Sequence, residues 1–225
     1  MISVIIASLN DKNSLLACLP SILAEAPFEV LIADGGSNDG TQEAVFGQAS
    51  LISTLPGRGC QFNQAAAKAQ GEVLLFLHAD SILPTGWSGE ITRLMAEPKI
   101  LAGAFQFKTD FRSWWMPLLE FGVALRSKYF ELPYGDQGLF LRRADFMRLG
   151  GYLEVPLMED FEFSRRISRQ GKIATSTLAL ITSGRRWQER GFWQVTKINL
   201  WIVALYLLGY PQEHLKSIYV SHKKP

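Results

Sequence analysis

The chain has 225 residues, enough for one domain with a full hydrophobic core. Hydrophobic residues make up 48% of it and charged residues 20%, which excludes an intrinsically disordered chain. The formal net charge of +2 provides no broad positive field, so we expect no nucleic-acid partner.

Strands and helices alternate through the first half of the chain. An apolar run over residues 3–7 predicts a strand, and a helical pattern follows to about residue 26, which Asn13 or Ser14 could cap. Further strands are expected at 29–33, 51–54 and 72–77, and further helices from Thr41 and over 57–69. Alternation of this kind is typical of parallel βαβ units. We therefore predict an α/β fold with a Rossmann-like, mostly parallel central sheet flanked by helices.

The second half is less regular. Strands are predicted at 101–108, 138–142 and 174–182, and helices over 114–129, interrupted by Pro117, and over 158–170. This mixture indicates an extension of the sheet that builds a second binding surface.

Polar residues follow three of the predicted parallel strands. Asn10 and Asp11 come after the first strand, Asp34 after the second and Asp80 after the fourth. Ligands of such sheets bind beyond the carboxyl ends of the strands. Asp34 precedes Gly35 and could accept hydrogen bonds from a ribose or a base, although an ordinary turn explains the same residues equally well.

A carboxylate at the end of a buried strand can hold a divalent cation against a diphosphate. Asp80 has this position, and Mg²⁺ and Mn²⁺ favour carboxylate and phosphate oxygens. His78 points the same way in an extended chain, so it is a candidate second ligand or hydrogen-bond partner.

Two other charged pairs have simple structural explanations. Glu159 and Asp160 open a predicted helix, where the helix dipole favours acids. Arg185 and Arg186 follow a strand; paired arginines can hold phosphates, but alone they would more often be a solvated surface.

The order of these motifs along the chain distinguishes a binding site from the ordinary structural explanations. Six segments in chain order resemble family 2 glycosyltransferases of the GT-A fold, and the resemblance runs from residue 3 to about residue 190. They are 3–10, 34–41, 57–63, 78–80, 159–160 and 185–187. The chain is also similar to a small bacterial branch of that family, which has His-Ala-Asp where most members have Asp-X-Asp.

The resemblance implies an inverting, hexosyltransferase-like enzyme that uses a UDP- or GDP-sugar and Mg²⁺ or Mn²⁺. It implies that Asp160, beside Glu159, is the catalytic base, and that Asp80, with His78 as the variant position, binds the metal. The implied donor-binding residues are Ser8, Asn10, Asp34, Gly35, Arg58, Asn63, His78, Asp80, Arg185, Arg186 and Trp187.

Acceptor recognition is expected in the second half. The candidates are Trp114, Tyr134, Gly135, Asp136 and Gln137, although Trp114 could equally be a core residue. We expect one catalytic domain over 1–190, with a nucleotide-sugar-binding half at 1–100 and an acceptor-binding half at 101–190. An apolar or amphipathic helical extension is expected over 191–225.

The apolar run from 200 to 209 is too short to cross a bilayer. The segment 192–210 could lie on a membrane, pack on the domain or form a homodimer. Cys18 and Cys60 lack metal-site spacing, so reduced buried thiols are expected. With no basic leader before the first strand, we expect a cytoplasmic protein, either free or peripheral on the inner face of the plasma membrane.

Three other functions are alternatives to a glycosyltransferase. A dinucleotide-dependent oxidoreductase needs a glycine-rich turn after the first strand, where this chain has Ser8-Leu-Asn-Asp11. A sugar nucleotidyltransferase shares the architecture but opens with a glycine-rich basic signature that is absent here. A non-catalytic nucleotide-sugar or glycan-binding module is the third alternative, and the presence of Asp34, Asp80 and Asp160 together argues against it.

Overall fold

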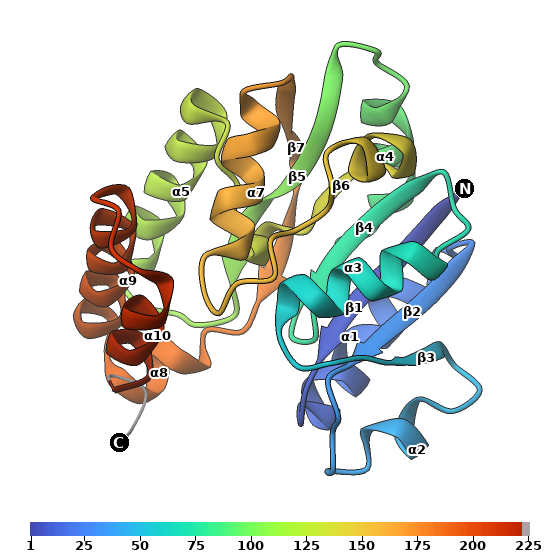
Figure 1. Cartoon of the computed structure of the whole chain (residues 1–225), viewed down its shortest axis with the longest axis horizontal. Helices are drawn as coiled ribbons and strands as arrows, with labels where there is room; N and C mark the ends of the chain where they lie inside the picture. The colour runs from blue at the N-terminus through green and yellow to red at the C-terminus, as the bar shows by residue number, and fades with distance from the viewer. Residues whose placement is uncertain (222–225) are drawn as a thin grey trace.

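A seven-stranded sheet in the order β3-β2-β1-β4-β6-β5-β7 crosses the molecule in this computed structural model, which describes residues 1–221 (Figure 1). All neighbouring strands are parallel except where β6 pairs antiparallel with β4 and β5. The strands are β1 (Ile2–Ser8), β2 (Glu29–Asp34), β3 (Ser50–Ser53), β4 (Val73–His78), β5 (Ile100–Thr109), β6 (Leu139–Arg142) and β7 (Lys172–Thr182). The predicted α/β fold with a mostly parallel sheet is confirmed.

Helices cover both faces of this sheet. They are α1 (Lys12–Leu23), α2 (Thr41–Val45), α3 (Arg58–Lys68), α4 (Trp87–Met95), α5 (Met116–Phe130), η1 (Gly135–Gln137), α6 (Arg143–Arg148), α7 (Glu159–Ser168), α8 (Arg185–Arg190), α9 (Phe192–Leu207) and α10 (Gln212–Ser221). Alternate residues of the strands face opposite layers: Val4 and Ile6 pack with α1 and α4, whereas Ile5 packs with α3 and α7. Cys18 and Cys60 are buried free thiols, as predicted.

The C-terminal helices pack on the domain through one face of α9. Ile202 and Leu205 of α9 join a buried cluster with Met158 and Phe161 at the start of α7, and with Leu215 of α10. The inner face of the segment 192–210 therefore packs on the domain, which was one of the three alternatives for this segment. No helix within residues 1–221 is long and apolar enough to span a membrane. The last four residues of the expected 191–225 extension lie outside the described residues.

Several local expectations were wrong. The first helix begins at Lys12 after Asp11, so neither Asn13 nor Ser14 is its cap, and it ends at Leu23. Pro117 does not interrupt α5, because it lies in the first turn, where no intrahelical donor is needed. The helices α4, α6 and α8 were not predicted.

One amide ties the carboxyl ends of β1 and β2 together. Gln61 of α3 is buried, and its Nε2 donates to the carbonyl oxygens of Ser8 and Ala33, each at 2.8 Å. The Gly35 amide donates to the Ser8 carbonyl oxygen at 2.9 Å. These contacts fix the strand ends that border the cavity described below.

We predict that Gln61→Leu lowers the free energy of unfolding by about 1–3 kcal/mol, because two buried carbonyls lose their side-chain donor. Urea unfolding checks this. Gln64→Leu, one turn along the same helix and half-buried, is the matched control and should stay within about 0.5 kcal/mol of wild type. Equal effects of the two substitutions would contradict the role assigned to Gln61.

Candidate functional site

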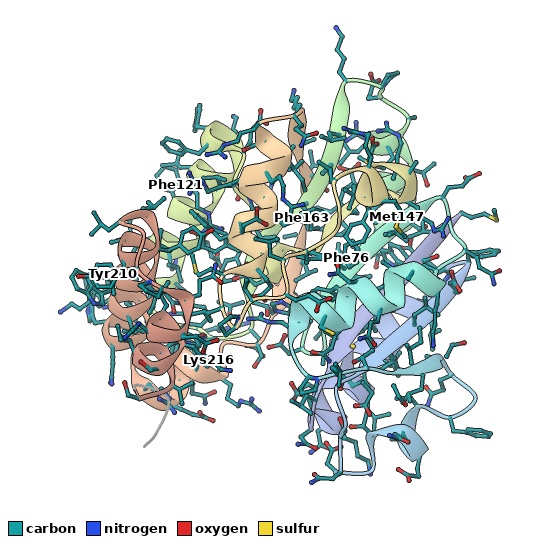
Figure 2. All side chains as sticks on the ribbon, in the orientation of Figure 1. Phe76, Phe121, Met147, Phe163, Tyr210 and Lys216 are labelled. Carbon is teal, nitrogen blue, oxygen red and sulfur yellow. The ribbon has the colours of Figure 1, made fainter. Side chains whose placement is uncertain are left out.

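A cavity of about 590 Å³ opens beyond the carboxyl ends of β1, β4 and β7. Figure 2 shows the crowded side chains between the C-terminal helices and the sheet, the region where these elements meet. The lining residues that matter here come from strand ends, from η1 and from the starts of α3 and α7: Ser8, Asp11, Arg58, His78, Asp80, Tyr134, Asp136 and Asp160. A further wall comes from α8, α9 and α10, with Arg186, Trp187, Asn199 and Tyr219.

Arg58 joins three elements at the centre of the cavity. Its Nε lies 2.8 Å from Glu159 Oε1 of α7, and its Nη1 lies 3.0 Å from His78 Nε2 at the end of β4. Burial, and then the Arg58 charge, lower the pKa of His78 to about 3, so the imidazole is neutral at physiological pH. Because Nε2 faces a guanidinium donor, Nε2 accepts and the ring proton is on Nδ1.

Asp160 is held facing the cavity by two backbone amides. Gly135 N–H donates to Oδ2 at 2.8 Å, and Phe161 N–H donates to Oδ1 at 2.7 Å. A Cβ at residue 135 would lie 2.8 Å from His78 Nε2 and 3.1 Å from Asp160 Oδ2. Gly135 therefore lets the loop before β6 approach the carboxylate closely.

Within residues 1–221 the Asp80 carboxylate forms no ion pair, although the Arg185 charge partly offsets the rise in its pKa. Its pKa is raised, first by burial and then by the negative charge of Asp11, which lines the same cavity. Thr182 Oγ1 donates to Asp80 Oδ1 at 3.5 Å. A cation bound here would relieve both the burial and the repulsion.

The donor set around Asp80 fits a divalent cation that is shared with a ligand. Within residues 1–221, no group of three His, Cys, Asp or Glu side chains forms a ready metal cage. Mg²⁺ is commonly bound by one or two carboxylates plus substrate phosphates, which Asp80 and Asp11 could supply in part. His78 Nε2 faces Arg58 instead, so its predicted role as a ligand stays a prediction that this geometry does not favour.

Two buried oxygens on the cavity wall have no hydrogen-bond partner among the described residues. Ser8 Oγ and Asp136 Oδ1 are both in this state, and both residues line the cavity. Burial raises the pKa of Asp136 to about 6; Arg126 opposes the rise and Asp160 adds to it. Unpartnered buried polar atoms are uncommon and indicate that a ligand completes the site.

Asp34 and Asn10 brace the loops beside the cavity. Asp34 is buried and accepts from Ser37 N–H at 3.2 Å and from Gln42 Nε2 at 3.2 Å. Asn10, at a φ of 53°, accepts the Asn38 N–H at 2.8 Å and so links the two loops. Neither residue lines the cavity, and Gly35 is buried beneath Gln61.

Three other predicted residues are also occupied elsewhere. Asn63 exchanges hydrogen bonds with the Tyr152 backbone, both at 2.9 Å. Gln137 is buried; its Oε1 accepts from Arg126 at 2.9 Å, and its Nε2 donates to Phe105 O at 3.0 Å. Arg185 is exposed, and its Nε lies 3.9 Å from Glu189 Oε1. The structure does not bring these side chains to the cavity.

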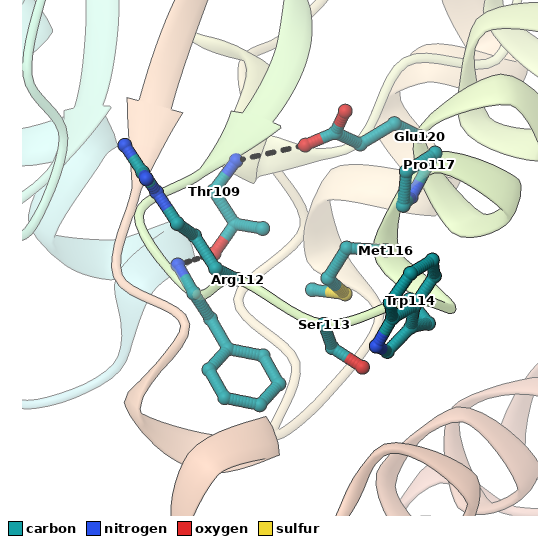
Figure 3. A pocket seen from close by; sticks show the side chains of 8 residues that line it. Thr109, Arg112, Ser113, Trp114, Met116, Pro117 and Glu120 are labelled. Atoms are coloured by element: carbon teal, nitrogen blue, oxygen red, sulfur yellow. Dashed lines mark hydrogen bonds between the residues drawn. The ribbon is translucent and has the colours of Figure 1, made fainter.

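Trp114 lines a different cavity, of about 510 Å³, with Met116, Pro117 and Glu120 (Figure 3). Its side chain is 98% exposed, so it is not a core residue. The main cavity has contributors that the sequence did not suggest: Gln61, Leu157, Asn199 and Tyr219. The helical periodicity of 192–210 could have shown which side of that segment faces inward, but not what it faces.

The family model for Glycosyl transferase family 2 matches residues 3–150. A search of curated proteins finds no match. Solved structures with the same fold include the mannosyltransferase PcManGT from Pyrobaculum calidifontis in complex with GDP-Man and Mn²⁺. It has a TM-score of 0.72 and 17% identity, over 98% of this chain and 69% of that one.

Two further structures resemble the chain. TarS from S. aureus in complex with UDP-GlcNAc has a TM-score of 0.64 and 19% identity, over 96% of this chain and 70% of that one. Glucosyl-3-phosphoglycerate synthase from Mycobacterium tuberculosis, in complex with Mn²⁺, uridine-diphosphate and glucosyl-3-phosphoglycerate, has a TM-score of 0.61 and 15% identity. That alignment covers 94% of this chain and 81% of the synthase chain. At these identities the likeness shows the GT-A fold.

We predict that Asp136→Asn raises the free energy of unfolding at pH 8 by about 1–3 kcal/mol. The pKa of Asp136 rises on folding from its ordinary value of 3.8 to about 6, so folding is opposed when the group is ionised. The gain should shrink as pH falls through 6 and vanish below 3.8. Urea unfolding across this range measures it.

Asp39 provides a control of opposite sign. Hydrogen bonds from Thr41 and Lys12 lower the pKa of this exposed carboxyl. Asp39→Asn should therefore destabilise the protein at neutral pH and lose its effect in acid. A stability gain from Asp136→Asn that does not depend on pH would contradict the burial of a charge at that position.

Proposed function

Because the chain belongs to glycosyl transferase family 2 and is therefore a glycosyltransferase, we propose that it transfers a sugar from a UDP- or GDP-sugar to an acceptor hydroxyl with inversion. The observation that carries the proposal is the shared cavity of Asp80 and Asp160, at the ligand-binding edge of the sheet. The structural neighbours named above include complexes with GDP-Man and UDP-GlcNAc, which supports a nucleotide-sugar donor.

Asp80, aided by Asp11, is the proposed holder of Mg²⁺ or Mn²⁺ beside the donor diphosphate. The PcManGT and glucosyl-3-phosphoglycerate synthase complexes contain Mn²⁺, which supports a divalent cation here. When bound, the cation would neutralise charge on the departing nucleoside diphosphate. The unpartnered Ser8 hydroxyl is available to the donor on the same wall.

Asp160 is the proposed base. Its carboxylate would take the proton from the acceptor hydroxyl as the hydroxyl oxygen attacks the anomeric carbon, while the bond from that carbon to the diphosphate oxygen breaks. A single displacement inverts the anomeric centre. Arg58 and Arg186, which also line the cavity, would stabilise the negative charge that develops on the leaving group.

Glu159, predicted beside the base, is better explained as a positioning residue. It is buried against Arg58, whereas Asp160 lines the cavity. Tyr134 and Asp136 are the proposed acceptor contacts; the Tyr134 ring lies 3.3 Å from the Arg126 guanidinium carbon, measured to its centroid, which fixes its orientation. In this proposal the first half of the domain supplies most donor contacts and the second supplies the base.

We predict that Asp160→Asn lowers turnover by at least about 10²-fold while donor binding persists, because only proton removal from the acceptor is lost. Single-turnover transfer and calorimetric donor titration measure the two effects. Glu162→Gln, on the same helix but paired with Arg166 at 2.7 Å, is the control and should retain turnover. Near-normal transfer by Asp160→Asn would remove Asp160 from this role.

A further inference from the structure

The helix α5 exposes an apolar stripe. Leu118, Phe121, Leu125 and Tyr129 are all exposed, and their spacing of three or four residues places them on one side of the helix; the exposed Trp114 lies just before its first turn. Only two residues of α5 itself, at positions 116 and 127, are buried. The outer side of this helix has no covering element within residues 1–221.

The helix α9 exposes a second stripe. Trp193, Leu200, Trp201 and Leu207 are exposed, whereas the opposite side of the helix is buried on α7 and α10. The inner side also contributes Asn199 and other residues to the wall of the main cavity. One helix therefore separates the candidate active site from an apolar outer surface.

The two stripes begin side by side. At the start of the helices, the ring centroids of Trp115 and Trp193 lie 4.9 Å apart. On the inner side, the buried Phe161 ring contacts both Tyr134, in the segment that follows α5, and Tyr206 of α9, with centroid separations of 5.6 and 5.3 Å. Figure 1 shows α5 and α9 along the same edge of the molecule, and Figure 2 places Phe121 and Tyr210 there.

The charges on this surface are nearly all positive. Arg112, Lys128 and Lys197 are exposed in the segments 112–130 and 192–210, whose only acid is Glu120. Glu120 is half-buried and accepts the Thr109 N–H at 3.4 Å. Tryptophan and tyrosine beside lysine and arginine are the residues that favour the headgroup region of a bilayer.

We propose that the α5–α9 surface, defined by the two stripes, docks on the interface of a bilayer that contains anionic lipid. Neither helix is long and apolar enough to cross it, so both lie on the membrane. A second copy of the chain is a poorer occupant, because self-association through this surface would bring like charges together. The proposal does not rest on the proposed function, since lipid binding is measured without donor.

Flotation with phosphatidylcholine vesicles, with and without phosphatidylglycerol, tests the proposal on the full chain. The wild type should float with the anionic vesicles, and less with the neutral ones. Phe121→Glu/Trp201→Glu should remain in the soluble fraction. Phe46→Glu is the matched control, because this aromatic side chain is 89% exposed next to α2, away from the surface, and it should float like wild type.

Two milder substitutions distinguish a loss of charge attraction to the lipid from a loss of folding. Lys128→Gln and Lys197→Gln should each lower the partition coefficient for anionic vesicles by about fivefold and leave the neutral vesicles unchanged. Wild-type protein left wholly in the soluble fraction would overturn the proposal, as would equal losses in the Phe46 and double variants. A third outcome would also overturn it: wild-type protein that binds no vesicles but forms a dimer in light scattering, while the Phe121→Glu/Trp201→Glu variant is a monomer.

Discussion

The Arg58 guanidinium holds α3, β4 and α7 together at the carboxyl edge of the sheet. Its partner Glu159 is buried, and a buried carboxylate is costly without a nearby cation. Burial, and then the Arg58 charge, lower the pKa of His78 and keep its imidazole neutral, and Arg58 Nη1 contacts its Nε2. Since Arg58 belongs to the first half of the chain and Glu159 to the second, this contact links the two halves beyond the β4–β6 pairing of the sheet.

The remaining geometry of the cavity follows from that contact. With Glu159 fixed at the start of α7, Asp160 is the next residue and is turned to the cavity, where the Gly135 amide holds it. Gly135 lies close to His78, and the next residue, Asp136, lines the cavity wall with one buried oxygen that has no partner within residues 1–221. Acids of both halves thus meet in one space that contains few compensating cations, a suitable arrangement for a ligand that brings a metal ion with it.

The sequence was sufficient for the mostly parallel sheet and for the position of Asp80, but not for that of Asp34, which lies beside the cavity. Strand-end placement was enough to expect Asp80 in the cavity, and the family resemblance was needed for Asp160, whose position at a helix start has an ordinary explanation. One helix that was not predicted is stabilised by a hydrogen-bond partner from a distant part of the chain. The helix α4 has no local side-chain cap; Glu25, at the end of α1, accepts from the Ser88 N–H at 2.9 Å instead. At Asp34 the partners are local instead: Ser37 and Gln42 engage its carboxylate, in keeping with the ordinary turn that explains this segment equally well.

A thermal-shift titration with UDP- and GDP-sugars, with and without Mn²⁺, tests the central claim most directly. The claim is that the cavity between Asp80 and Asp160 binds a nucleotide-sugar together with a cation. A ligand at 100 times its Kd stabilises the folded state by about 2.7 kcal/mol, so the melting temperature should rise with at least one donor, and more with Mn²⁺. In Asp80→Asn the Mn²⁺-dependent part of the rise should disappear. No shift with any donor, or full retention of the Mn²⁺ effect in Asp80→Asn, would contradict the account.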